Sequence, residues 1–260
     1  MQKLYSKTMK IADLHIHSNF SFDGRSTMEE YVNTALQRGV SVLCFTDHVE
    51  CNHLFETFSA FQFEKRMLDF DKLKARYGKD IKLLLGVEFG EPHLHIKEFE
   101  FVKSTNPDMI IGSVHYAMDY YSFVGGLSPA ECVQMHNKLV YDVVDMGQVD
   151  VLGHLDLPKR YLKQRYVEDL AANQQILELC VKRGVVPEVN TSTLRRGLAQ
   201  TMPSIDDLRY YLNAGGKYVV VNSDAHVCNE LATNYQAVYN TLPAGLEGCY
   251  FEKRTLKPLN

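Results

Sequence analysis

Short apolar runs alternate with longer amphipathic stretches from one end of the chain to the other. The short runs have the continuous apolar character of buried parallel strands, whereas in the longer stretches apolar residues recur at helical spacing. The predicted strands are residues 10–15, 40–46, 81–87, 109–114, 149–153, 185–189 and 218–221. The predicted helices are residues 27–38, 59–77, 96–103, 129–147, 166–183, 205–214 and 230–240, and an irregular tail follows.

The predicted helix ends carry recognisable signals. Three helices begin at a capping-box pattern, in which a hydroxyl side chain is followed three residues later by an acidic one. The three patterns are Ser26-Thr27-Met28-Glu29, Ser128-Pro129-Ala130-Glu131 and Ser204-Ile205-Asp206-Asp207. Glycine ends several helices, as at Gly39, Gly78 and Gly184.

The order of these elements predicts the fold class. Regular strand–helix alternation indicates an α/β protein with a parallel sheet and right-handed crossovers. Seven such units favour a TIM-like barrel, although an open doubly wound sheet would also satisfy the alternation. The 260 residues contain no linker or break in composition, so we expect a single domain over residues 1–260.

Ionisable side chains gather where the predicted strands end. In chain order they are His15 and His17, Asp47 and His48, Glu88, His115, His154, Glu188 with Asn190, and Asp224 with His226. In a parallel barrel the carboxyl ends of the strands share one rim, and active sites form there. Residues far apart in the sequence are therefore expected to converge on one pocket, with His15 and His17 pointing the same way from an extended segment.

Each of these residues also has an ordinary structural role. A lone histidine such as His115 or His154 can be a hydrogen-bonded rim residue, and Glu88 can form a salt bridge. Together, however, these roles would leave several ionisable groups crowded without compensation, which bound cations resolve. Imidazole and carboxylate ligands suit zinc, iron or manganese. We therefore favour a metal site, with Asp47 orienting His48 from behind.

Composition narrows the class of protein. A net charge of -4 and a pI near 6.2 argue against an extended nucleic-acid-binding surface. Six cysteines without a CxxC motif indicate free thiols rather than a disulfide framework. The sequence shows no signal-peptide pattern and no apolar run long enough to cross a membrane. We expect a cytoplasmic protein with a small-molecule substrate and neither a membrane nor a nucleic-acid partner; the oligomeric state stays open.

The strand-end residues resemble the motifs of the polymerase-and-histidinol-phosphatase (PHP) superfamily. The matching segments are Asp13-Leu14-His15-Ile16-His17, Thr46-Asp47-His48, Gly112-Ser113-Val114-His115 and Asn222-Ser223-Asp224-Ala225-His226. Glu88 and His154 complete the pattern. The resemblance covers essentially the whole chain. It implies a distorted (β/α)7 barrel, the PHP fold, that carries three divalent or transition metal ions, namely zinc, manganese or iron.

The resemblance also implies how the ligands are shared among the three ions. One ion is assigned to His15, His17, Glu88 and Asp224. Glu88 bridges to a second ion, which His115 and His154 complete. The third ion is assigned to Asp23, His48 and His226, with Asp23 at a position where some relatives carry histidine.

Within the superfamily the chain is most similar to the monofunctional L-histidinol-phosphate phosphatases of histidine biosynthesis. The similarity rests on residues 112–116, 153–161 and 187–192. It implies a phosphoric monoester hydrolase that converts L-histidinol phosphate to L-histidinol and phosphate. Two alternatives stay open: a PHP phosphoesterase that acts on nucleotides or nucleic-acid ends, and a non-catalytic metal-binding domain.

Phosphate ester chemistry suggests further candidate residues. Hydrolysis needs an aligned nucleophilic oxygen, cations for the phosphoryl oxygens and a proton for the leaving oxygen. We expect a hydroxide that bridges two of the metals to attack, with Asp224 moving protons and His226 as the second candidate. Arg160 and Arg195 follow strands that end at the same rim, so they are candidates for bidentate phosphate contacts.

The alcohol portion of the substrate needs its own contacts. Glu188 or Asn190, at the end of the sixth predicted strand, could meet the ammonium group. Tyr116, directly after His115, could pack on the imidazole ring.

Overall fold

Short parallel strands from the whole length of the chain form two sheets in the computed structural model, which describes residues 10–259. The smaller sheet has the order β1 (Ile11–Ile16), β2 (Val40–Phe45), β4 (Lys82–Leu85). The larger has the order β11 (Thr255–Pro258), β10 (Glu247–Glu252), β9 (Tyr218–Asn222), β8 (Val186–Asn190), β7 (Val151–Leu152), β6 (Ile110–Ser113), β5 (Val87–Gly90), β3 (His48–Val49). Only β10 and β11 pair in antiparallel fashion among the described strand pairs.

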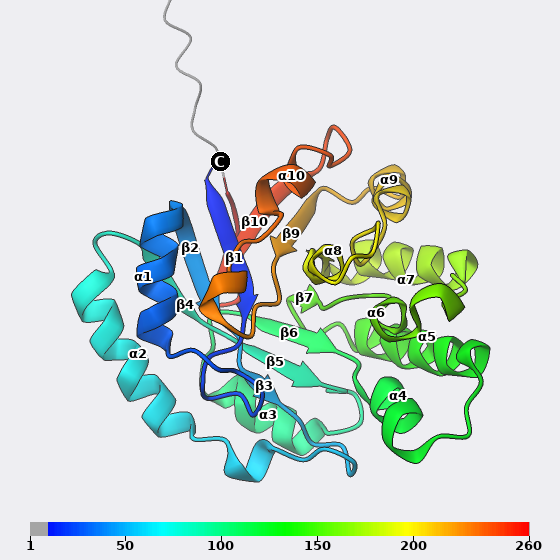
Figure 1. Ribbon diagram of the computed structural model, residues 1–260, viewed down its shortest axis with the longest axis horizontal. Helices are drawn as coiled ribbons and strands as arrows, with labels where there is room; N and C mark the ends of the chain where they lie inside the picture. Colours follow the sequence, from blue (N-terminus) through cyan, green and yellow to red (C-terminus); the bar gives the residue numbers. More distant parts are fainter. Residues whose placement is uncertain (1–9, 260) are drawn as a thin grey trace, which may run out of the picture.

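Helices surround these strands. The longer ones are α1 (Met28–Arg38), α2 (Phe63–Tyr77), α3 (Ile96–Ser104), α5 (Pro129–Met146), α7 (Leu170–Arg183) and α9 (Ile205–Asn213). Helices α1 and α2 lie on one side of the molecule and α5 and α7 on the other (Figure 1). The short helices α4 (Tyr116–Asp119), α6 (Pro158–Leu162) and α8 (Ser192–Arg195) follow β6, β7 and β8, so they lie next to the carboxyl ends of those strands. A last short helix, α10 (Tyr235–Tyr239), follows β9.

The smaller sheet joins the larger one at both of its own edges, which makes the barrel closed but distorted. Strands β4 and β5 are consecutive, and the chain changes sheets between them at Gly86. A Cβ atom at this position would lie 2.6 Å from the Met109 carbonyl oxygen, so only glycine fits the close approach. At the other edge the His17 amide donates to the Ala225 carbonyl over 2.8 Å, which brings the ends of β1 and β9 together. The distorted (β/α)7 barrel is thereby confirmed.

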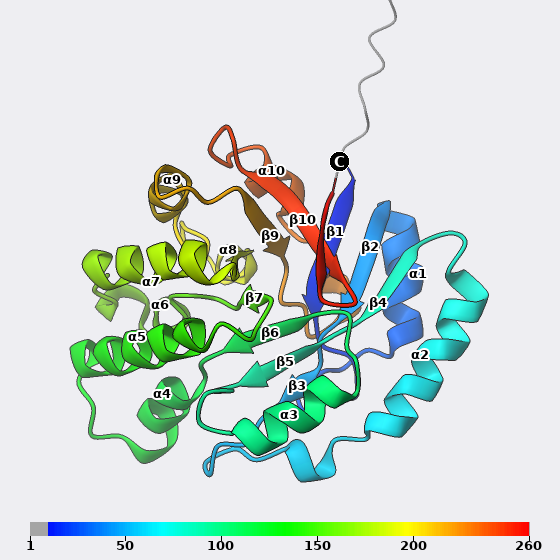
Figure 2. The same cartoon turned by 180° about the vertical axis from the view of Figure 1, so that it is seen from behind.

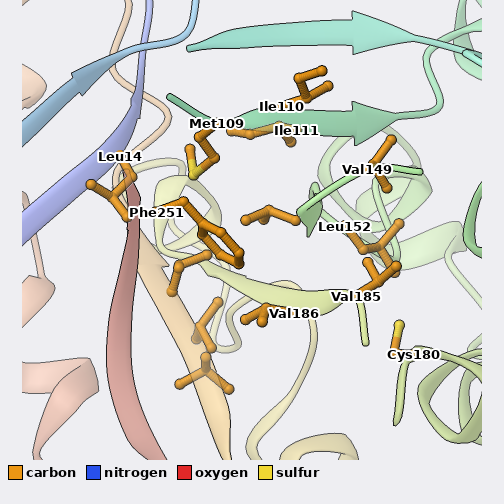
Figure 3. Close-up of a cluster of buried hydrophobic side chains, with 14 of the residues drawn as sticks. Leu14, Met109, Ile110, Ile111, Val149, Leu152, Cys180, Val185, Val186 and Phe251 are labelled. Atoms are coloured by element: carbon orange, nitrogen blue, oxygen red, sulfur yellow. The ribbon is translucent and has the colours of Figure 1, made fainter. Parts of the chain in front are cut away.

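Apolar side chains fill the interior of the barrel. Figure 3 shows Leu14 from β1, Leu152 from β7, Val186 from β8 and Phe251 from β10 in one cluster with Met109. Each is 5% exposed or less, and burial of one such side chain contributes roughly 1.5–3 kcal/mol to folding. Because the interior is apolar, the polar strand-end residues lie outside it, at the rim of the barrel.

Several element boundaries differ from the sequence prediction. The first helix is capped one residue later, by Thr27 with Glu30 rather than by Ser26 with Glu29. The predicted helix over 59–77 begins only at Phe63. A separate 3-10 helix, Phe58–Ala60, precedes it, and the Thr57 and Phe58 amides at its start donate to the Glu50 carbonyl.

The carboxyl-terminal part differs more. The predicted helix over 230–240 shrinks to α10, which begins after Asn234, a residue with a φ of +63°. The predicted irregular tail is instead the β10–β11 hairpin, whose β10 pairs in parallel with β9 (Figure 2). The six cysteines are unpaired, as predicted. Over residues 10–259 the structure holds no helix with the length and apolar character that crossing a membrane requires.

Arg66 on α2 joins the helix layer to the strands, and its loss should destabilise the protein. The guanidinium pairs with Asp47 over 2.6 Å and donates to the Phe45 and Gly86 carbonyls, with the side chain 4% exposed. Arg66→Ala should lower the free energy of unfolding by about 3–5 kcal/mol, because the Asp47 charge stays buried without a partner. Urea denaturation measures the change.

Arg76→Ala is the matched control, because Arg76 lies on the same helix in an exposed pair with Glu29. Exposed pairs contribute about 1 kcal/mol or less, so this variant should stay near the wild type. Equal losses in the two variants would contradict the structural role given to Arg66.

Candidate metal centre

The predicted strand-end residues meet at one rim of the barrel. His15 lies in β1, His48 begins β3 and Glu88 lies in β5. His17, His115, His154, Asp224 and His226 lie just beyond the ends of β1, β6, β7 and β9. The strands bring these side chains together because parallel strands present their carboxyl ends to the same side.

Glu88 is the common centre of the cluster. Its carboxylate oxygens lie 2.9–3.4 Å from a ring nitrogen of each of five histidines, namely His154, His15, His48, His115 and His17. Glu88 is fully buried, and burial by itself would raise its pKa. The positive charge of the nearest imidazoles outweighs that effect and holds the pKa of Glu88 well below its usual range. The carboxylate therefore stays ionised.

The predicted ligands form four overlapping groups, in each of which the potential ligand atoms all lie within 4.8 Å of one another. The first group is His17, Asp23, His48 and His226, and the second is His15, His154 and Asp224. The other two contain Glu88, in one case with His15 and His17 and in the other with His48 and His115. The first group contains the three residues expected at the third ion, together with His17. His226 Nε2 lies 2.9 Å from an Asp23 oxygen, and the His17 ring stacks on the rings of His48 and His226 with centroids 4.1 and 4.2 Å apart.

The cluster fits metal ions better than it fits hydrogen bonding alone. His15 Nε2, His17 Nε2 and Glu88 Oε2 are buried and close together, yet none makes a hydrogen bond of acceptable geometry. Burial, reinforced by His48 and His226, lowers the pKa of His17 to about 3. Its imidazole is therefore neutral, the form that binds metals. Buried imidazole nitrogens and carboxylate oxygens that converge without pairing suit a divalent metal ion.

Carboxylates behind the imidazoles fix their orientation. Glu188 accepts from His15 Nδ1 over 2.6 Å and from the His154 amide over 2.7 Å. Glu50 lies 2.8 Å from His115 Nδ1 and 3.2 Å from His48 Nδ1. Such pairs set which ring nitrogen faces a metal. Glu50 was missed in the sequence, although its place two residues beyond His48 puts it on the same side of an extended segment.

Three residues lie in other surroundings than we expected. Glu188 does not line the pocket and is fully buried beneath His15 and His154. Asn190 is also fully buried, and its amide donates to Glu188 and Asp224 over 3.1 Å. The Asp47 carboxylate accepts from the Ser18 amide and from Arg66 rather than from His48.

A pocket of about 440 Å³ opens above the cluster. His48, His115, His154, Asp224 and His226 line its metal side. Arg160, on α6, also lines it and is 8% exposed; its guanidinium pairs with Asp224 and donates to Ser192 over 2.8 Å. Arg160 is thus placed for contact with an anion held at the cluster.

Two predicted substrate contacts lie outside this lining. The Arg195 guanidinium donates to the Ser223 and Asp224 carbonyls and pairs with Glu230 over 3.3 Å, so it holds the loop after β9 instead of facing the pocket. Its neighbour Arg196 is the residue that lines the pocket. Tyr116 packs near His53, with ring centroids 5.6 Å apart, and its amide donates to Glu91.

Comparison with known proteins gives consistent results. The chain is 27% identical to a protein named "Probable histidinol-phosphatase" from Clostridium acetobutylicum, over 95% of this chain and 99% of the relative. It is 26% identical to one of the same name from Deinococcus radiodurans, with the same coverage. The fold matches a crystal structure of histidinol phosphate phosphatase from Lactococcus lactis complexed with Zn, L-histidinol and phosphate. That match has a TM-score of 0.82 at 21% identity and covers 95% of this chain and 99% of the other.

The conserved-domain comparison decides the family. Residues 13–192 match the PHP domain, a range that begins just before His15 and includes His48, Glu88, His115 and His154. This range is more than half of the chain. The protein therefore belongs to the PHP domain family.

Proposed function

We propose that this protein is a metal-dependent phosphatase that hydrolyses L-histidinol phosphate to L-histidinol and phosphate. The observation that carries the proposal is the buried Glu88 carboxylate in contact with five imidazoles, beneath a pocket that Arg160 also lines. Relatives that match nearly the full chain are named histidinol-phosphatase, and the Lactococcus structure contains L-histidinol and phosphate. These matches support the choice of substrate.

We assign the centre three zinc, manganese or iron ions. His15, His17, Glu88 and Asp224 would hold one ion, and Glu88, His115 and His154 a second. Asp23, His48 and His226 would hold the third. The ligand groups around Glu88 and the zinc in the Lactococcus structure support this assignment. When bound, such ions neutralise phosphoryl charge and activate water near neutral pH.

The protein's own side chains would position the ester and move protons. Arg160 presents a planar guanidinium, which matches two phosphoryl oxygens at once. Burial alone would raise the pKa of Asp224, but Arg160 and His15 outweigh it and keep the pKa well below its usual range. Asp224 is therefore ionised and can accept a hydrogen bond from water at Oδ1, which lies 3.4 Å from His17 Nε2, so it is the first candidate for moving protons. His226 lines the pocket and is the second candidate for proton transfer to the leaving oxygen.

Substrate comparison tests the proposal. Purified protein would be assayed with L-histidinol phosphate, a panel of nucleoside monophosphates and p-nitrophenyl phosphate. The proposal expects the highest kcat/KM for L-histidinol phosphate. A preference for a nucleotide would favour the alternative PHP phosphoesterase instead. The single domain, the cytoplasmic location and the absence of nucleic-acid and membrane partners stay predictions.

Arg160→Ala should weaken substrate binding without emptying the metal centre. Hydrogen bonds to a charged group contribute about 1.5–3 kcal/mol, so kcat/KM should fall on the order of ten- to a hundredfold. Steady-state kinetics and elemental analysis on the same preparation measure both effects. Arg165→Ala is the control, because Arg165 is exposed a few residues further on and does not line the pocket. An unchanged kcat/KM in Arg160→Ala would remove this residue from the site.

A further inference from the structure

The pocket lining contains two chemically different groups of side chains. The metal side carries the histidines, Asp224 and Arg160. The second group is Phe22, Phe55, Met118, Phe123 and the carboxylate of Asp119, and the Phe22 ring stacks on His48 with centroids 5.2 Å apart. A substrate that is only a phosphate would use the metal side alone, so the second group points to the chemistry of the alcohol portion.

Asp119 is the pocket carboxylate that the metal centre does not account for. It ends α4, the helix that directly follows His115, and its amide donates to the His115 carbonyl over 2.9 Å. Two other lining carboxylates outside the predicted ligand set have cationic or imidazole partners. Glu50 contacts His115 and His48, and Glu230 pairs with Arg195. Among the described residues, no lysine or arginine forms an ion pair with Asp119.

The structure holds the Asp119 carboxylate in place through a neutral group. Asn52 Nδ2 donates to Asp119 Oδ2 over 3.3 Å. Asn52 is 3% exposed, and its own Oδ1 accepts from the Leu54 and Phe55 amides over 3.0 and 2.9 Å. The amide is therefore oriented by the backbone before any ligand arrives, and it positions the carboxylate without neutralising its charge. A preorganised charge loses little entropy when a cation binds.

The neighbouring side chains favour an organic cation. Phe22 and Phe55 contact each other with ring centroids 4.3 Å apart, and Phe22 and Phe123 are 53% and 67% exposed. Exposed aromatic faces beside a carboxylate can bind a flat ring and a cation together. A phosphate monoester without a cationic group, in contrast, would leave the Asp119 carboxylate without a partner.

From this arrangement we infer that Asp119 binds the ammonium group of the substrate and selects amino-alcohol phosphates over other phosphate monoesters. The inference rests on the proposed function and adds a residue to it. Phosphate lies on the metal side with Arg160, and the ammonium lies against Asp119. The neighbouring phenylalanines, Phe22, Phe55 and Phe123, enclose the imidazole.

The test compares L-histidinol phosphate with the analogue that lacks only the amino group. In the wild type, kcat/KM should be higher for L-histidinol phosphate. In Asp119→Asn, the ratio of the two kcat/KM values should fall on the order of ten- to a hundredfold, mainly through KM. Asp119→Glu, which keeps the charge, should lose less. Because both substrates are measured on one preparation, the ratio does not depend on the fraction of active protein.

Three outcomes separate the explanations. A fall in the ratio supports the ammonium contact. An unchanged ratio, with both substrates affected equally or not at all, overturns the role of Asp119 and leaves the proposed function intact. A wild-type protein that hydrolyses p-nitrophenyl phosphate but neither of the two compounds overturns the proposed function and this inference together.

Discussion

Removal of divalent metal is expected to abolish phosphatase activity, and addition of zinc or manganese should restore it. The physical reason is electrostatic, because binding brings the negative charge of the ester next to the negative carboxylates of the site. The dianionic ester would enter a pocket above the buried, ionised Glu88 and Asp224, and without cations these charges repel. Metal ions supply several kcal/mol of charge stabilisation, so we expect a loss on the order of a thousandfold or more.

The measurement needs two controls. Elemental analysis of the chelated protein shows that metal has left, and a sample dialysed without chelator shows that handling alone does not inactivate the protein. Circular dichroism before and after chelation checks that the fold persists. Full activity in protein that elemental analysis shows to be metal-free would refute the mechanism.

Substitution of Glu88 by glutamine should have a similarly large effect. Glutamine keeps the shape of the side chain but removes the negative charge that five imidazoles share. It also places an N–H donor where a metal ion requires an acceptor oxygen. We expect bound metal to decrease and kcat to fall on the order of a thousandfold.

Glu64→Gln provides the matched comparison, because Glu64 is an exposed carboxylate on α2 outside the pocket lining. This variant should retain wild-type metal content and kcat. A Glu88→Gln protein that keeps both its metal and its rate would show that Glu88 does not ligate the ions. A Glu88→Gln protein that keeps its metal but has a lower kcat would show that Glu88 acts in the reaction and is not needed to bind the ions.

Much of the site could be predicted because strand periodicity fixes where side chains go. His15 lies at the end of a buried strand and Glu88 within another, so once the strands are parallel their neighbouring carboxyl ends must meet. The polar residues after an apolar run therefore predicted both the fold and the pocket. The capping boxes at Ser128 and Ser204 likewise fixed two helix starts, because they satisfy free amide groups locally.

Other features depend on contacts between distant segments and are not visible in a linear pattern. Glu188 and Arg160 both lie near the carboxyl end of a strand. Glu188 is nevertheless buried behind His15, whereas Arg160 lines the pocket. The sequence did not show that Arg195 turns toward the Ser223 carbonyl while Arg196 faces the pocket. The β10 strand was missed because it is stabilised by pairing with β9 rather than by its own pattern.

Anomalous X-ray scattering from a crystal grown with phosphate is the most direct test of the central claim. The claim is that the imidazoles and carboxylates around Glu88 hold a cluster of metal ions at the bottom of the pocket. We expect anomalous peaks within bonding distance of Glu88, His15, His115 and His226, with phosphate between those peaks and Arg160. An active crystal with no anomalous signal at Glu88, or with its metal bound elsewhere on the molecule, would contradict it.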